Sequence, residues 1–148
     1  MAYLLIPLVR AEDSAPPNPV EPLAAWVAVT SGSPDACLIL DDRGRVAGCS
    51  VPAAEMLGEG LDQMRGRSLV GEVIDVVDFS AQAGPGDHYA LRIPPLLALA
   101  SEMPARGLLR VRHGDGRHVT IDAVSAPLHA PGGRLAGSVS FLAAIATT

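Results

Sequence analysis

Three glycine-containing turns, each between two short apolar segments, most constrain how this 148-residue chain can fold. The turns lie at Gly44, Gly116 and Gly133, and glycine adopts the positive φ of tight turns with little penalty. A turn this short makes the strands on either side of it run antiparallel. The pattern predicts five strands, at residues 36–40, 46–49, 107–113, 117–128 and 134–146.

Helical signals lie before the first hairpin and between the second and third predicted strands. Asn18 and Glu21 resemble a capping box, and helical spacing of apolar residues after them predicts a helix over residues 20–32. A short helix is expected from Pro52 to Gly58, and another begins at Pro94. Strands and helices grouped in this way predict an α+β fold, with short helices on one face of an antiparallel sheet.

Composition excludes several classes of function. The net charge is −5, and all basic residues are Arg, so lysine Schiff-base chemistry and a phosphate-loop lysine are excluded. Nucleic-acid affinity depends mainly on Lys and Arg, so this acidic chain predicts no nucleic-acid partner. The apolar run Tyr3–Val9 is interrupted by Pro7 and is too short to span a bilayer, so no membrane partner is expected. With two cysteines only, we expect a cytoplasmic protein.

The chain divides into three parts by composition. Residues 1–19 form an extension that ends in a Pro-rich linker, residues 20–32 form the N-terminal helix, and residues 33–148 form one domain. The run Tyr3–Val9 has two readings: a strand that docks elsewhere, or a loosely ordered terminus.

Five segments in order resemble the PAS domain family of sensor and interaction modules, over about residues 33–146. They are Ser33–Ala36 with Asp41–Val46, Pro52–Gly58, Arg67–Leu69, Val111–Arg117 with Ser125–Leu128, and Gly132–Val139. The resemblance, together with the three hairpins, implies the strand order 2-1-5-4-3.

Two departures from the family pattern bear on function. Val51 stands where relatives have Asn, so Ser50 is expected to cap the following helix. The usual Asp-Ile-Thr ending is replaced by Ala144-Ile145-Ala146, and no output domain follows. We therefore expect the signal to pass to a separate signalling protein, unless the chain is a fragment.

The resemblance also raises the question of a cofactor. Relatives that bind flavin use Asn and Gln side chains, but the single Asn is Asn18, and Gln63 and Gln82 lie in or near predicted loops. His88 has the place of a haem ligand, yet a neighbouring glycine-rich loop and the prolines that follow favour an exposed histidine. We therefore expect no cofactor, with a haem- or other cofactor-binding sensor as the alternative.

In this family a ligand lies between the inner sheet face and the short helices. Strand alternation and family position give an apolar set that either lines such a pocket or simply packs as core. The candidates are Leu57, Val73, Ile74, Val77, Leu97, Leu109, Val111, Ile121, Val139 and Phe141. The expected function is to sense a small apolar ligand, to mediate protein–protein interaction, or both. No nucleophile–base pair has a recognisable setting, so a small enzyme ranks last.

Two further side-chain sets carry weaker signals. Cys37 and Cys49 are expected to pair across the first hairpin, as a redox disulfide or, more commonly, as buried free thiols. His113, His118 and Asp115 flank the second turn and are expected to be solvated, so we predict no metal site.

The N-terminal helix is expected to take part in assembly. Its apolar residues Leu23, Trp26 and Val27 predict a homodimer interface with Trp26 at or near it. The small residues Ala136, Ser138 and Ser140 of the last strand are expected to let a helix settle closely. The alternative is that the helix folds back onto its own sheet and the protein is a monomer.

Overall fold

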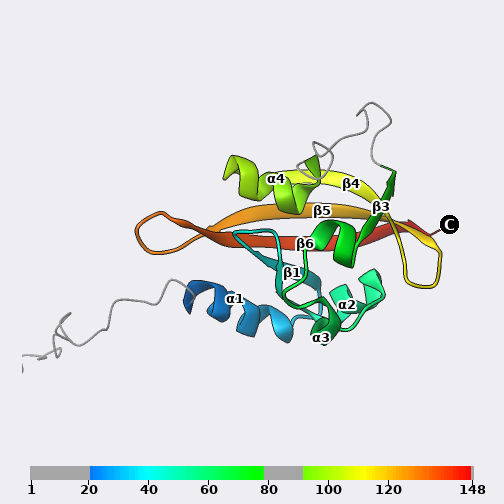
Figure 1. The fold of residues 1–148 in the computed structure, drawn as a ribbon, viewed down its shortest axis with the longest axis horizontal. Helices are drawn as coiled ribbons and strands as arrows, with labels where there is room; N and C mark the ends of the chain where they lie inside the picture. The colour runs from blue at the N-terminus through cyan, green and yellow to red at the C-terminus, as the bar shows by residue number, and fades with distance from the viewer. Residues whose placement is uncertain (1–20, 79–91, 148) are drawn as a thin grey trace, which may run out of the picture.

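The computed structural model describes residues 21–78 and 92–147, which form one curled antiparallel sheet with helices packed on it (Figure 1). The strands are β1 (Ala36–Asp41), β2 (Val46–Cys49), β3 (Asp75–Asp78), β4 (Ala105–Arg112), β5 (His118–His129) and β6 (Leu135–Thr147). The helices are α1 (Glu21–Ser31), α2 (Val51–Leu57), α3 (Leu61–Met64) and α4 (Pro94–Ser101), and an irregular helical segment, η2, spans Leu69–Val73. None of the described helices is long and apolar enough to cross a membrane.

The strand order is β2-β1-β6-β5-β4-β3, so the sheet has six strands where five were predicted. The predicted order 2-1-5-4-3 holds for the five expected strands, which are β2, β1, β6, β5 and β4. The additional strand, β3, pairs with the free edge of β4, with Asp75 opposite Arg112 and Asp78 opposite Arg110. Its sequence Asp-Val-Val-Asp is short and charged at both ends, so the hairpin rules did not detect it.

The inner face of the sheet carries the main core. Buried side chains from five strands, among them Leu38 and Ile121, pack there against α2, α3, η2 and α4. Met64 of α3 and Leu69 of η2 are buried in the same core. The hydroxyl of Ser138 donates a hydrogen bond to the carbonyl of Pro95 over 3.2 Å, which ties α4 to β6. The face of β6 that carries Ser138 was predicted to receive the N-terminal helix. In the structure this face lies against α4 instead.

Helix α1 lies on the opposite, outer face of the sheet, because its side chains pack on strand residues that alternate with those of the inner core. Ile39 alternates with the core residues Leu38 and Leu40, and it forms a second cluster with Leu128 and Val139. Leu23 and Val27 of α1 pack on that cluster. Gly137 and Gly48 allow this approach, because an added Cβ would lie 2.9 Å from Leu23 Cδ1 and 2.7 Å from Val27 Cγ1, respectively.

The local signals around α2 are confirmed. The Ser50 hydroxyl accepts hydrogen bonds from the backbone N–H of Cys37 at 2.9 Å and of Ala53 at 3.4 Å, so it caps α2 and ties it to β1. Gly58 ends the helix in the left-handed conformation, with φ of 81°. Gly44, Gly116 and Gly133 all have positive φ, as predicted for the three hairpins.

The predicted pairing of Cys37 with Cys49 is wrong by one residue. Leu40 pairs with Val46 but Ile39 pairs with Gly48, so Ala47 forms a bulge, and Cys49 lies opposite Leu38. Cys37 precedes Leu38 on β1, so its side chain faces the other side of the sheet, because successive side chains of a strand alternate. Both cysteines are free and buried.

Candidate functional site

The structure brings six of the ten predicted pocket residues together. These six belong to the inner core, where each is at most 8% exposed, and they are Leu57, Val73, Ile74, Leu109, Val111 and Ile121. Side chains as inaccessible as Ile121 and Val111 have no water-sized space beside them. The region between sheet and short helices is therefore filled by side chains around these residues.

The other four predicted pocket residues lie elsewhere. Val139 belongs to the outer cluster beneath α1. Phe141 shares the outer face with Val139 and is exposed, and Val77 and Leu97 are also exposed. Their role as ligand contacts remains a prediction.

The structure places none of the residues considered for a flavin or a haem in the described inner core. Gln63 is exposed on α3, while Asn18, Gln82 and His88 lie outside the described residues. The histidines within the described ranges are His113, His118 and His129, and the inner core includes none of the three. Among the described residues, this core therefore presents neither an amide to a flavin ring nor an imidazole to iron.

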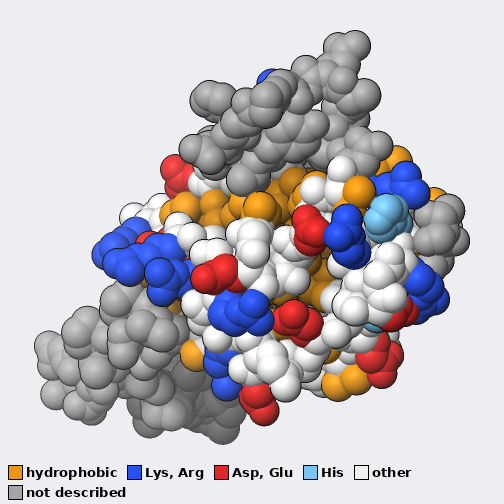
Figure 2. Space-filling model, turned by 45° about the vertical axis from the view of Figure 1, so that its right-hand side comes forward, with side chains coloured by type: hydrophobic (Ala, Val, Ile, Leu, Met, Phe, Trp, Pro, Cys, Tyr) orange, Lys and Arg blue, Asp and Glu red, His pale blue; other side chains and the backbone are white. Residues whose placement is uncertain are grey.

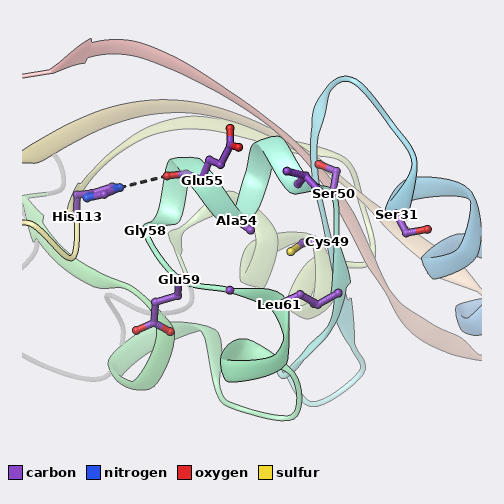
Figure 3. A pocket seen from close by; sticks show the side chains of 11 residues that line it. Ser31, Cys49, Ser50, Ala54, Glu55, Gly58, Glu59, Leu61 and His113 are labelled. Atoms are coloured by element: carbon purple, nitrogen blue, oxygen red, sulfur yellow. Dashed lines mark hydrogen bonds between the residues drawn. The ribbon is translucent and has the colours of Figure 1, made fainter.

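A surface groove of about 590 Å³ lies beside α2 (Figure 3). Cys49 and Ser50 come from the end of β2, and Val51, Ala54 and Glu55 come from α2. The rest of the lining is the loop from Gly58 to Gly60 with Leu61, Ser31 at the end of α1, and His113 at the end of β4. Most of this lining is apolar, and the volume is in the range that small ligands or side chains occupy.

Two glycines shape this groove. Gly58 ends α2 and Gly60 precedes α3, so the loop between the helices has little side-chain bulk. Sequence reasoning identified Gly58 as a helix stop but did not find the groove. The spacing Gly58-Glu59-Gly60 was the available signal, since glycine often marks a close approach of another chain segment or ligand.

His113 joins the β4–β5 hairpin to α2 at one end of the groove. Its Nε2 lies 3.1 Å from the Glu55 carbonyl oxygen (Figure 3). Its Nδ1 lies 3.2 Å from Asp115 Oδ1. An added Cβ on Gly58 would be 2.9 Å from the imidazole ring. His113, which was predicted to be solvated, is therefore half-buried and connects two elements of the structure. The described residues contain no group of three side chains that could hold a metal ion.

The Cys49 sulfur faces the groove from its inner end (Figure 3). Burial raises the pKa of this thiol, and the nearby positive charge of Arg65 opposes the effect only in part. A protonated thiol is a poor nucleophile, so the groove has no activated cysteine.

Charges lie at the other end of the groove. Glu59 forms an ion pair of 3.2 Å with Arg67, and Glu55 is exposed on α2. Figure 3 shows both carboxylates directed away from Cys49 and Leu61. The groove is therefore apolar at the Cys49 end and acidic at its rim.

A second feature is the exposed apolar part of the outer sheet face. Val124 on β5 and Phe141 on β6 lie directly opposite each other and are 44% and 47% exposed. Leu108 on β4 lies opposite Asp122, which precedes Val124 by two residues on β5 and shares its face. The Leu108 side chain is also exposed. By contrast, Figure 2 shows acidic and basic side chains interspersed over the face drawn there, with no large area of one sign.

Comparison with known proteins gives one consistent result. A family model described as the PAS fold matches residues 30–147. A search among curated proteins found no match. The chain is similar to the crystal structure of a PAS domain from Colwellia psychrerythraea, with 18% identity and a TM-score of 0.62 over 83% of this chain and 96% of that one.

Two further structures show the breadth of the likeness. The LOV protein of Rhodobacter sphaeroides is 16% identical with a TM-score of 0.67, covering 85% of this chain and 68% of that one. The PAS domain of the fruit-fly ELK potassium channel is 12% identical with a TM-score of 0.62, covering 83% and 96%. At such identities these structures support the fold and carry no assignment of ligand or partner.

Proposed function

Because the chain belongs to the PAS family of sensory and interaction modules, we propose that it acts through protein–protein contact at the outer face of its sheet. The observation that carries the proposal is the contrast between the two faces. Around the described core residues the inner face is filled by side chains, whereas the outer face leaves Val124, Phe141 and Leu108 exposed. Large adjoining apolar side chains in water commonly mark an interaction site.

The uncovered outer residues adjoin the part of the sheet that α1 covers. Val139 lies two residues before Phe141 on β6, and it packs beneath Leu23 and Val27. These two residues of the predicted interface thus hold α1 on its own sheet. Trp26 is 40% exposed and remains available for contact with another molecule.

The proposed partner at this face is a second copy of the chain. A two-fold contact places the same patch on both subunits, so an apolar centre meets itself and needs no complementary charge. Aromatic residues are enriched in the buried centres of such interfaces, which suits Phe141 and Trp26. The dimer would then pass its signal to a separate protein, as expected from the sequence.

Light scattering after size-exclusion chromatography tests the dimer. The wild-type chain is expected to have the mass of two chains, and Phe141→Asp the mass of one, because a carboxylate would be buried at the contact. Met103→Asp is the matched control: Met103 is exposed but lies in the loop before β4, so this variant should remain dimeric. A wild-type chain that stays monomeric at high concentration would overturn the proposed partner.

A further inference from the structure

We infer that the groove beside α2 binds residues 3–9 of this same chain, Tyr-Leu-Leu-Ile-Pro-Leu-Val. These residues lie outside the described part of the structure. The groove is separate from the outer sheet face, so this inference does not depend on the proposed dimer.

The chemistry of the groove suits aliphatic side chains. Val51, Ala54, Leu61 and Cys49 supply apolar lining, and the hydroxyls of the two serines beside them are already hydrogen-bonded. The Ser50 hydroxyl donates to the Asp35 carbonyl at 2.7 Å and accepts two backbone N–H groups. The Ser31 hydroxyl donates to the Ala28 carbonyl at 2.9 Å. The Ser50 hydroxyl is therefore fully used, and the O–H donors of both serines are occupied.

The position of α1 brings residues 3–9 within reach. The helix has 11 residues, from Glu21 to Ser31, and Ser31 lines the groove. A helix of this length spans about 16 Å. Residues 10–20 contain three prolines, and in an extended Pro-rich conformation they would span about 34 Å. The connecting segment is therefore about twice as long as it needs to be to run back along α1.

The sequence of the segment matches the two ends of the groove. Residues 3–9 carry no charge, as the apolar lining requires, and Arg10 follows directly. Glu55 at the rim provides a carboxylate that a guanidinium can meet. Pro7 removes one backbone donor and favours an extended chain, which suits a groove better than the interior of a sheet.

A second cleft lies nearer to Glu21 but fits the segment less well. Its volume is about 330 Å³, and its lining includes Asp41, Asp42 and Arg134 beside Leu23 and Leu135. An aliphatic segment would have to desolvate these charged groups, which is unfavourable without partners. The α2 groove has more space and a more apolar lining.

A nitroxide spin label tests this inference on the full chain. The label is attached to the cysteine of an Ala2→Cys variant, because the native thiols are buried, and amide signals are recorded by NMR. We expect the amides of Ala54, Gly58 and Leu61 to be broadened, while those of Val124 and Leu135 are spared. In the same chain carrying Leu5→Asp and Leu8→Asp, this broadening should disappear. The matched control Ser14→Asp, in the linker, should retain it.

Four outcomes would overturn the inference. Broadening centred on Val124 and Phe141 would place the segment on the outer face, and broadening at Leu135 and Ala136 would place it in the smaller cleft. Uniform weak broadening would mean that it has no fixed site. A mixture of labelled and isotope-enriched unlabelled chains identifies exchange between copies: groove broadening found only in that mixture would assign the segment to a second copy.

Discussion

Gly58 combines two requirements at the residue scale, a left-handed backbone and close contact with His113. The φ of 81° would cost an L-residue about 1–2 kcal/mol. An added Cβ would also lie 2.9 Å from the imidazole ring and 3.0 Å from the Gly114 amide nitrogen. We expect Gly58→Ala to lower the free energy of unfolding by more than the backbone cost alone, as measured by urea denaturation.

Gly66 provides the matched control for this prediction. It has the same φ of 81°, but an added Cβ would have no neighbour within 4 Å. Gly66→Ala should therefore lower the free energy of unfolding only by the cost of the left-handed backbone. Equal losses of stability for Gly58→Ala and Gly66→Ala would mean that His113 moves away without cost. The contact between α2 and the β4–β5 hairpin would then contribute little to stability.

The two thiols should be unreactive in the folded protein. Cys37 is 1% exposed and Cys49 is 4% exposed, and burial raises the pKa of Cys49. An aromatic disulfide reagent that releases a coloured thiolate should report no reaction at neutral pH and two thiols after unfolding in guanidinium. A rapid reaction of one native thiol would contradict this.

The same pKa shift predicts how stability changes with pH. The folded state holds the Cys49 proton more tightly than the unfolded state, so its contribution is complete below the unfolded pKa and is lost as pH rises through the folded pKa. Cys49→Ala should therefore show a smaller decline in stability at alkaline pH than the wild-type chain, measured by urea denaturation across that range.

At the scale of elements, α1 is held on the sheet by direct contact of its side chains with strand backbone. Gly48→Ala would place a Cβ 2.7 Å from Val27 Cγ1, so we expect it to displace α1 and destabilise the protein. Val27→Ala removes that methyl group, and the double variant should recover part of the loss, with a coupling of ~0.5–3 kcal/mol. Denaturation gives the free energies, and fluorescence of Trp26, the single tryptophan, reports on α1.

Gly32→Ala is the control for that cycle, because an added Cβ there has no neighbour within 4 Å. It should neither couple to Val27→Ala nor change the Trp26 emission appreciably. Strictly additive effects of Gly48→Ala and Val27→Ala would mean that α1 adjusts its position without penalty.

Elements specified by neighbouring residues were predicted correctly, and those specified by distant ones were not. The cap at Ser50, the stop at Gly58 and the three glycine turns follow from short-range rules. Strand β3 forms because the edge of β4 is free, which no local pattern in Asp75–Asp78 reveals. The bulge at Ala47 shifts Cys49 by one residue, and only the pairing of both strands determines it.

The candidate site was less predictable for the same reason. Alternation correctly selected Ile121 and Val111 as inward-facing, but it cannot distinguish a pocket lining from a filled core. Val139 and Phe141 also alternate, yet they face the outer side of the sheet. The groove joins β2, α2 and the end of β4, so its lining comes from residues far apart in the sequence.

At the scale of the whole molecule, the sheet in the described part of the chain separates a face packed with short helices from a face that is partly exposed. The short helices cover the inner face, whereas α1 covers only the part of the outer face around Ile39, Leu128 and Val139. Recognition by this protein is therefore expected at its surfaces, at the uncovered outer face and at the α2 groove. A ligand in the interior would have to displace well-packed side chains, and such repacking is costly.

The close packing of the described core residues leads to the last prediction, that the purified chain binds neither haem nor flavin. A ring system of that size would have to replace several side chains of the inner core, where Ile121, Val111 and Leu69 are at most 1% exposed. The absorption spectrum should show only the ultraviolet bands of Trp26 and the tyrosines, both as purified and after incubation with haemin or flavin mononucleotide followed by gel filtration. His88→Ala is the discriminating variant, because His88 lies outside the described residues. A visible band that survives gel filtration in the wild-type chain and is absent in His88→Ala would mean that His88 ligates haem and that the core opens to admit it.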